Sequence, residues 1–168
     1  MGKEASNDIS GLIGQYAHGN EPSHHIAYLY AYAGQPWKTA EKVRLILDSL
    51  YSADPDGLSG NEDVGQMSAW YVMSALGFYP VHPAAGIYVF GSPLFDQVSI
   101  NVGHGRHFTM HMKNNSKTNR YIQKILLNNT NYTRSYITYT DIMKGGELII
   151  EMGKRPSAYW GTGVTDRP

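Results

Sequence analysis

The sequence has 168 residues, enough for one ordinary domain or two small ones. It is 42% hydrophobic and 17% charged, which excludes disorder as the main state because enough apolar surface exists to offset the entropy lost on ordering. Fourteen Lys and Arg balance fourteen Asp and Glu, so the chain lacks the basic excess of a general nucleic-acid binder. The absence of cysteine excludes a disulfide framework, a zinc knuckle and a thiol nucleophile.

Membrane insertion is not expected either. No apolar run approaches the roughly 20 residues that a helix needs to cross a bilayer. The first residues, Met1-Gly2-Lys3-Glu4, lack the apolar core of a signal peptide.

Three segments before residue 80 have helical spacing. Residues 22–33 are apolar or aromatic nearly all round, which predicts a helix buried on more than one side. In residues 36–52 the apolar positions recur at three- and four-residue steps, and Pro36 suits the first helical turn. Residues 64–76 predict a third helix that ends at a Gly77 cap.

After residue 80 the pattern changes to short strand-like segments separated by Gly- and Asn-rich turns. They are residues 87–90, 98–102, 108–112, 121–127, 136–139 and 148–152. This arrangement is typical of an antiparallel β-sandwich. We therefore predict an α+β chain, with a helical part over residues 1–80 and an antiparallel sandwich over residues 81–168.

The helical part is too small and too apolar to bury its own surface. We expect it to be a piece of something larger, with open apolar faces at Tyr28, Tyr32, Trp70 and Tyr71. Exposed faces of this kind promote association, so an oligomer or a rearranged helical part is predicted.

A first polar cluster reads His18-Gly19-Asn20-Glu21-Pro22-Ser23-His24-His25. Asn20 and Glu21 precede a helix start, where Asn is a good capping residue. The same oxygens also suit a hard cation or sugar hydroxyls, and the spacing leaves both interpretations open. His24 and His25 point about 100° apart on a helix, so one packed and one hydrogen-bonded histidine is favoured over a shared metal.

A second cluster reads Gly60-Asn61-Glu62-Asp63-Val64-Gly65-Gln66, again before a helix. Asp63 with Gln66 three residues later forms a variant of the capping box, which is a structural interpretation. Alternatively, a loop carboxylate held ionised by backbone N–H groups can act as a general base.

The two clusters together resemble a known enzyme family. Residues 11–25, Gly-Leu-Ile-Gly-Gln-Tyr-Ala-His-Gly-Asn-Glu-Pro-Ser-His-His, are similar to one motif of glycoside hydrolase family 92, the bacterial calcium-dependent exo-α-mannosidases. Residues 60–71 resemble its second motif, which continues through Gly77-Phe78-Tyr79-Pro80 to Gly91-Ser92-Pro93-Leu94-Phe95. Nearly the whole chain resembles the C-terminal part of much longer family members.

The resemblance implies a β-sandwich paired with an (α/α)6 barrel, and hydrolysis of terminal α-mannosides with inversion, assisted by Ca²⁺ bound to the mannose 2- and 3-hydroxyls. It implies that Asp63 is the general base, with Glu62 and Asn61 beside it. Asn61 is a departure, because some members carry Asp there. An inverting enzyme also needs an acid about 6.5–9.5 Å from the base, and that acid is expected upstream of this chain.

The resemblance also implies further site residues. Gln15, Asn20 and Glu21 are the expected Ca²⁺ ligands, and the expected sugar contacts are His18, His24, His25 and Gln66. Members that prefer α-1,2 linkages carry a His-Glu pair where this chain has Lys3-Glu4, so the linkage preference stays open. The expected partners are a mannose-containing glycan and the remainder of a periplasmic or secreted parent protein.

Two other functions compete with this one. The chain could be a non-catalytic carbohydrate-binding module, with Tyr121, Tyr136 and Tyr139 as stacking residues on one sheet face. It could also be a structural β-sandwich support, whose carboxylates only cap helices.

Overall fold

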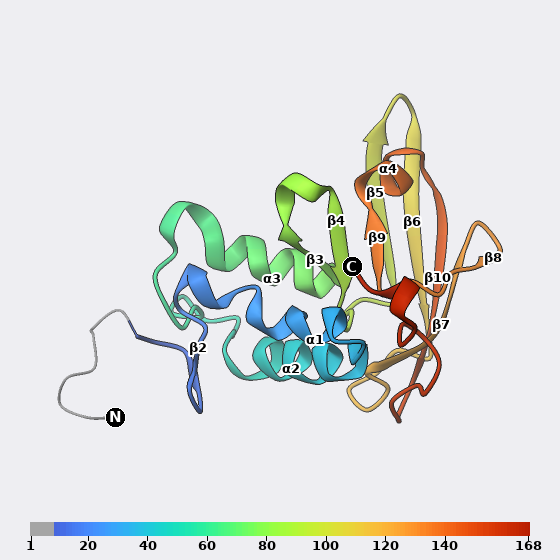
Figure 1. The fold of residues 1–168 in the computed structure, drawn as a ribbon. Helices are drawn as coiled ribbons and strands as arrows, with labels where there is room; N and C mark the ends of the chain where they lie inside the picture. The colour runs from blue at the N-terminus through green and yellow to red at the C-terminus, as the bar shows by residue number, and fades with distance from the viewer. Residues whose placement is uncertain (1–8) are drawn as a thin grey trace.

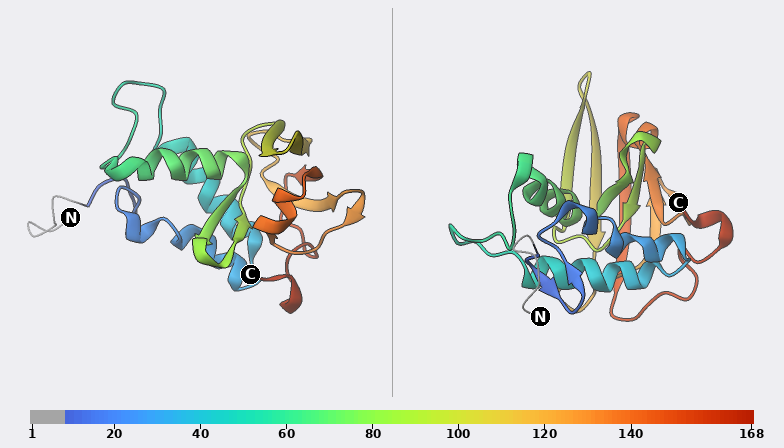
Figure 2. Two further views of the ribbon diagram at one scale, coloured as in Figure 1. Left: turned by 90° about the horizontal axis from the view of Figure 1, so that it is seen from above. Right: turned by 60° about the vertical axis from the view of Figure 1, so that its left-hand side comes forward.

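A computed structural model describes residues 9–168, with a helical half beside a β-sheet half (Figure 1). The helical half comes first in the chain, and the C-terminal strands lie on the opposite side from the N-terminal hairpin. Figure 2 shows the loop between α2 and α3 projecting from the helical half.

The helical half begins with a short hairpin and ends with the longest helices. Its elements are β1 (Leu12–Ile13), β2 (Tyr16–Ala17), η1 (Glu21–Ser23), η2 (Ile26–Tyr28), α1 (Leu29–Tyr32), α2 (Pro36–Ser49), η3 (Asp63–Gly65) and α3 (Gln66–Leu76).

The predicted helices at 36–52 and 64–76 are confirmed as α2 and α3. Pro36 opens α2, where its missing N–H costs nothing. Gly77 caps α3 in the left-handed conformation, with φ of 112°. The segment 22–33 is wrong as one continuous helix, because it divides into two 3₁₀ turns and the single turn of α1.

The sheet half contains two sheets. The three-stranded sheet has the order β3 (Phe78–His82), β4 (Ile87–Phe90) and β9 (Tyr136–Thr138), and the 3₁₀ turn η4 (Pro83–Ala85) joins its first two strands. The five-stranded sheet has the order β5 (Gln97–Gly103), β6 (Arg106–Lys113), β10 (Gly146–Gly153), β7 (Tyr121–Leu127) and β8 (Thr130–Asn131). The remaining elements are α4 (Tyr139–Met143) and η5 (Val164–Asp166).

The expected antiparallel arrangement is wrong at one position. β10 pairs parallel with β6, with Gly146 opposite Phe108 and Glu151 opposite Lys113. It pairs antiparallel with β7 on its other edge. The chain leaves the sheet through β9 and α4 before β10 returns between β6 and β7, and such a crossover permits parallel pairing.

The six predicted strands are present, with small shifts at their ends. Tyr139 is an exception, because it starts α4 instead of ending β9. The Thr138 hydroxyl accepts a hydrogen bond from the Asp141 amide at 3.1 Å, which caps the first turn of that helix. Strand β3 was not predicted, and it accommodates Pro80 at a register shift between Tyr79 and His82.

Strand β4 separates two hydrophobic cores. Val89 packs with the buried residues of the helical half, whereas Phe90 packs with residues of both sheets. This follows from the alternation of side chains along a strand. The three-stranded sheet therefore lies between the helices and the five-stranded sheet, and the helical half depends on it for burial.

The predicted open apolar faces are partly wrong. Tyr28 and Trp70 are fully buried, because they face each other and β4 within the helical core. Tyr32 is exposed as predicted, and it is one of several large apolar side chains that are exposed on the helical half. They include Ile26, Leu29, Tyr32, Leu45 and Val72, with exposed fractions of 36 to 53%.

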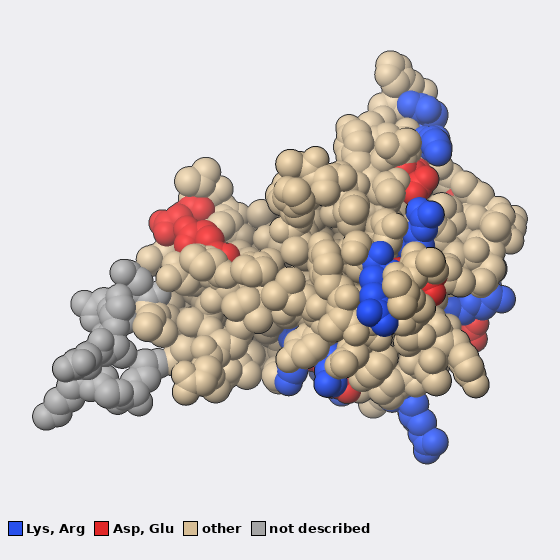
Figure 3. All heavy atoms as spheres, in the orientation of Figure 1, with Lys and Arg blue, Asp and Glu red and all other residues tan. Residues whose placement is uncertain are grey.

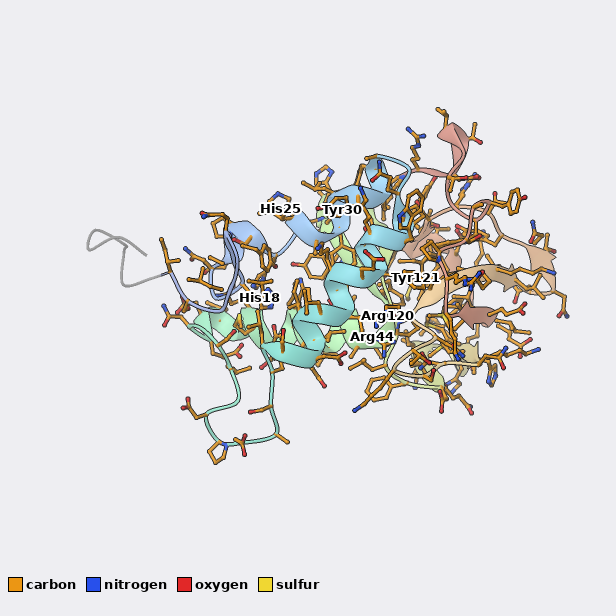
Figure 4. All side chains as sticks on the ribbon, turned by 90° about the horizontal axis from the view of Figure 1, so that it is seen from below. His18, His25, Tyr30, Arg44, Arg120 and Tyr121 are labelled. Atoms are coloured by element: carbon orange, nitrogen blue, oxygen red, sulfur yellow. The ribbon has the colours of Figure 1, made fainter. Side chains whose placement is uncertain are left out.

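Helix α2 is joined to the five-stranded sheet by polar contacts. The Tyr121 hydroxyl on β7 donates to the Glu41 carboxylate at 2.6 Å. Arg44 is buried, and its Nη2 donates to the Ser92 hydroxyl at 3.0 Å and to the Pro93 carbonyl. Figure 4 shows Arg44, Arg120 and Tyr121 together at this junction, which fixes the helical half against the sheets.

Within residues 9–168, no helix is long and apolar enough to span a bilayer.

Candidate functional site

The two polar clusters of the sequence meet through glycine backbones. A Cβ atom added to Gly60 would lie 2.3 Å from the Gly19 Cα, and one added to Gly11 would lie 2.6 Å from the Ser59 Oγ. These separations are far below van der Waals contact, so only glycine permits such a crossing. The segment that carries Asn20 and Glu21 is thereby held against the segment that precedes Glu62 and Asp63.

A hydrogen-bonded chain of side chains supports this crossing from inside. His18 is fully buried, with Nδ1 2.8 Å from the Tyr16 hydroxyl and Nε2 2.7 Å from the Tyr51 hydroxyl. Tyr51 donates onward to the Met67 carbonyl at 3.1 Å. Burial, together with the neighbouring His24, lowers the pKa of His18 to about 3, so the imidazole is neutral at pH 7.

His24 is also buried, and both its ring and its carbonyl make hydrogen bonds within the protein. Its Nε2 donates to the His18 carbonyl at 3.0 Å, and the Trp70 indole N–H donates to the His24 carbonyl at 3.0 Å. Burial lowers the pKa of His24, opposed by its bond to the His18 carbonyl and by Glu21. Figure 4 shows His18 inside the helical half and His25 at its edge. Of the three expected sugar-binding histidines, only His25 is exposed.

The expected cation ligands lie on two elements, the β1–β2 hairpin and the start of η1. Asn20 precedes η1 and makes no capping hydrogen bond with its side chain, and Glu21 is exposed. Gln15 lies at the tip of the β1–β2 hairpin, whereas Gly11 and His18 are paired at its base. Gln15 is five residues before Asn20 in the chain, and Asn20 and Glu21 are adjacent. Their joint role as cation ligands stays a prediction.

The loop before α3 distributes its carboxylates differently from the predicted capping box. Glu62, not Asp63, accepts hydrogen bonds from the Ser68 amide at 3.2 Å and the Ser68 hydroxyl at 2.8 Å. Gln66 donates to the Asn61 carbonyl at 3.0 Å instead of to the Asp63 region. In the part of the chain that the structure describes, the exposed Asp63 carboxylate accepts no hydrogen bond. Asp63 is therefore not used as a cap.

Val64 follows Asp63 in a strained conformation. Its φ of 54° and ψ of 27° lie in the left-handed region, which a β-branched residue rarely adopts. Its side chain is fully exposed, so packing does not explain the conformation. Strain of this kind costs on the order of 1–3 kcal/mol and is found mostly at functional sites. It sets the backbone direction next to Asp63.

The surface around the start of α3 is acidic. Figure 3 shows Asp and Glu side chains gathered at this end of the molecule, while Lys and Arg lie mainly over the sheet half on the same face. Beside this end, Tyr51 and Tyr71 border an open hollow of about 440 Å³ that also includes Ser68. In residues 9–168, no group of three or more His, Asp or Glu side chains could hold a metal ion by itself.

The tyrosines that a carbohydrate-binding module would use do not form one platform. Tyr121 lies on β7 of the five-stranded sheet and is tied to Glu41, whereas Tyr136 lies on β9 of the other sheet under the Arg134 guanidinium. Tyr139 lies on α4. Three rings on different elements do not present a flat face to a sugar chain.

The sequence matches the description "Glycosyl hydrolase family 92 catalytic domain" over residues 1–154. The chain belongs to glycoside hydrolase family 92. Its fold is similar to that of a family 92 α-mannosidase from Bacteroides thetaiotaomicron solved with mannoimidazole, with a TM-score of 0.91 and 43% identity over 96% of this chain. It is also similar to a family 92 inverting mannosidase from that organism, with a TM-score of 0.87 and 46% identity over 92% of this chain.

A fungal relative gives the same assignment. A protein of Arthroderma benhamiae, named an uncharacterized secreted glycosidase, is 37% identical over 153 residues, or 89% of this chain. The chain spans only about a fifth of each of these three relatives, with 20 or 21% of their length covered. Lys3-Glu4, considered for linkage preference, lies outside the described residues.

Sequence reasoning did not find the residues that hold the site in shape. Tyr16 and Tyr51 were not singled out, although they are the two partners of His18. Tyr16 lies within the first motif itself, only two residues before His18. The pairing of Gly19 with Gly60 had a weaker signal, namely a glycine in each motif next to the Asn-Glu pair.

Proposed function

We propose that the protein containing this chain is an inverting, Ca²⁺-dependent exo-α-mannosidase, and that this chain supplies its general base. The observation that carries the proposal is the close approach of Gly60 to Gly19, because Asn20 and Glu21 directly follow one glycine and Asp63 lies three residues after the other. Glu21 and Asp63 are exposed, and Asp63 accepts no hydrogen bond from residues 9–168. Membership of family 92 and similarity to an inverting mannosidase support it.

In this mechanism Asp63 accepts a proton from a water molecule as that water attacks the anomeric carbon. The new bond joins the water oxygen to the carbon, and the glycosidic C–O bond breaks. The leaving oxygen takes a proton from a general acid, which we place outside this chain. Glu62 contributes by holding the start of α3 through Ser68, and the strain at Val64 fixes the direction of Asp63.

The side chains present have the oxygen atoms that a hard cation prefers, but they are too few to fill its coordination shell. Ca²⁺ takes six to eight oxygen ligands, and Asn20 and Glu21 offer side-chain oxygens with no other partner in residues 9–168. Further ligands would have to come from sugar hydroxyls, water and the rest of the polypeptide. When bound, Ca²⁺ would polarise the sugar hydroxyls and help distort the ring.

We further propose that the helical half forms part of an (α/α)6 barrel, and that the two sheets belong to a β-sandwich beside it. The exposed apolar side chains of η2, α1 and α2 would then pack on helices of the parent protein. A secreted parent is consistent with the fungal relative's name.

Isolated, the chain lacks an acid and most of a sugar pocket, so it should release no mannose from an aryl α-mannoside with Ca²⁺ present. Turnover by the isolated chain would show that the acid is misplaced.

Substitutions in the full-length protein test the assignment of roles. Asp63→Asn keeps the shape of the side chain but cannot accept the proton of the water. We expect a roughly 10²- to 10⁴-fold loss of kcat with KM nearly unchanged, because a base acts mainly in the transition state. Glu21→Gln should instead raise the Ca²⁺ concentration needed for activity, since an anionic ligand is lost. Asp56→Asn, in the exposed loop before the second cluster, is the matched control.

High Ca²⁺ should recover part of the activity of Glu21→Gln and none of that of Asp63→Asn. NMR of the freshly released sugar should show the β-anomer, as inversion requires. Equal rescue of both variants, or an unimpaired Asp63→Asn, would refute these roles.

A further inference from the structure

With a neutral His18 ring, only one arrangement of protons makes all three hydrogen bonds of this chain at once. The Met67 carbonyl can only accept, so the single hydroxyl hydrogen of Tyr51 points to it. The Tyr51 oxygen must then accept from His18 Nε2 at 2.7 Å, which places the hydrogen on that nitrogen. Nδ1 keeps its lone pair and accepts from the Tyr16 hydroxyl at 2.8 Å. The chain runs one way, from Tyr16 through His18 and Tyr51 to Met67.

Burial makes the neutral ring the favourable form. His18 has no exposed surface, and its ring contacts Trp70 edge-on with centroids 4.4 Å apart. The rings of His24, Tyr51 and Tyr16 lie at 4.9, 5.5 and 5.7 Å. A charged imidazolium in this setting would lack a counter-ion within hydrogen-bonding distance among the described residues.

A second route leads from His18 to the same helix through the backbone. The His18 carbonyl accepts from His24 Nε2, and the His24 carbonyl accepts from the Trp70 indole, both at 3.0 Å. Both routes end in the first half of α3, at Met67 and Trp70. On its other side, the His18 amide donates to Gly11 at 2.9 Å. His18 thus joins the hairpin to the helix that begins three residues after Asp63.

We propose that His18 is a positioning residue, whose neutral ring, with hydrogen on Nε2, fixes the Asn20–Glu21 segment relative to Asp63. This rests on the function proposed above. A rigid ring with a donor at one end and an acceptor at the other satisfies both tyrosines at once. His18 reaches the reaction only through these neighbours and touches no substrate.

Nitrogen NMR tests the proton arrangement directly. In the chain labelled with ¹⁵N-histidine at pH 7, the His18 spectrum should show a protonated Nε2 and an unprotonated, hydrogen-bonded Nδ1. The resonances are assigned by their loss in His18→Gln, with the exposed His107→Gln as the matched control. Tyr16→Phe should shift Nδ1 towards the position of a free lone pair and leave Nε2 protonated. A hydrogen on Nδ1, or rapid averaging of both forms, would overturn the proposal.

Kinetics of the full-length protein test the consequence. Tyr51→Phe removes one hydroxyl from the chain, and His18→Gln retains a donor near Nε2 but loses the ring. We expect each to lower kcat about 10- to 100-fold with little change in KM, the size usual for residues that orient a functional group. His107→Gln should keep the parental kcat. Parental kcat in both variants, together with native melting temperatures, would overturn the positioning role.

The two proposals fail in different ways. If the full-length protein does not hydrolyse α-mannosides with inversion, the proposed function is refuted, and the NMR experiment still decides the proton arrangement. If it is active and the His18 and Tyr51 variants keep parental kcat, the mannosidase stands and the positioning role falls.

Discussion

Gly60→Ala tests the crossing of the two motif segments without touching any proposed site residue. Gly60 has no left-handed φ, so its backbone conformation tolerates alanine. The new methyl group would nevertheless lie 2.3 Å from the Gly19 Cα and 2.8 Å from the Gly19 carbonyl oxygen. Carbon atoms normally pack about 3.5–4.0 Å apart, so the two backbones must separate by roughly 1 Å or more.

The cost can be estimated from this clash. Overpacking costs about 1–3 kcal/mol, and we expect the upper end because the obstructing atoms are backbone. For a chain of this size, about 3 kcal/mol lowers the melting temperature by roughly 6–12 °C. Thermal unfolding followed by far-ultraviolet circular dichroism measures the change. In the full-length protein the same substitution should also lower activity.

Ser59→Ala is the matched control, one residue earlier in the same loop. It removes a buried hydroxyl that has no hydrogen-bond partner in the described part of the chain. Its melting temperature should therefore be unchanged or slightly higher. If Gly60→Ala melts within about 2 °C of the parent, the two segments do not cross as described, and the basis of the candidate site is lost.

Three further predictions concern stability and assembly. Val64→Gly should raise the melting temperature by a few degrees, since about 1–2 kcal/mol of left-handed strain exceeds the added entropy of the unfolded chain; a lower melting temperature would count against the strain. Because the pKa of His18 is low in the folded state, the unfolded state binds a proton more readily than the folded state does. The free energy of unfolding is therefore complete above pH 6.5 and falls below that pH, by about 2 kcal/mol at pH 5. Urea unfolding above pH 6.5 and at pH 5 should show a smaller loss in His18→Gln. The isolated chain should self-associate in sedimentation experiments through its exposed Leu29 and Leu45, and Leu45→Lys should shift it towards monomer; a monomeric parent chain would contradict this.

Local patterns in the sequence determined much of the secondary structure. The alternation in residues 108–112 and the three-four spacing in residues 36–52 each specify one buried face, and both elements form where they were predicted. Gly77 ended α3 because glycine adopts the left-handed cap without strain. The residues of the two motifs and their order along the chain were also sufficient to indicate the family.

What the sequence left open depends on segments that are far apart in it. The parallel pairing of β6 with β10 joins residues almost 40 positions apart, and nothing in either strand specifies its neighbour. Asp63 was the predicted cap of α3, and only the position of Ser68 assigned that task to Glu62 and left Asp63 without a hydrogen bond from residues 9–168. The role of His18 was decided by Tyr51, 33 residues later, because a hydrogen bond depends on where the partner atom lies in space. Spacing along the chain determines only which nearby residues can interact, whereas burial and long-range contacts determined the strand pairing, the cap of α3 and the partners of His18.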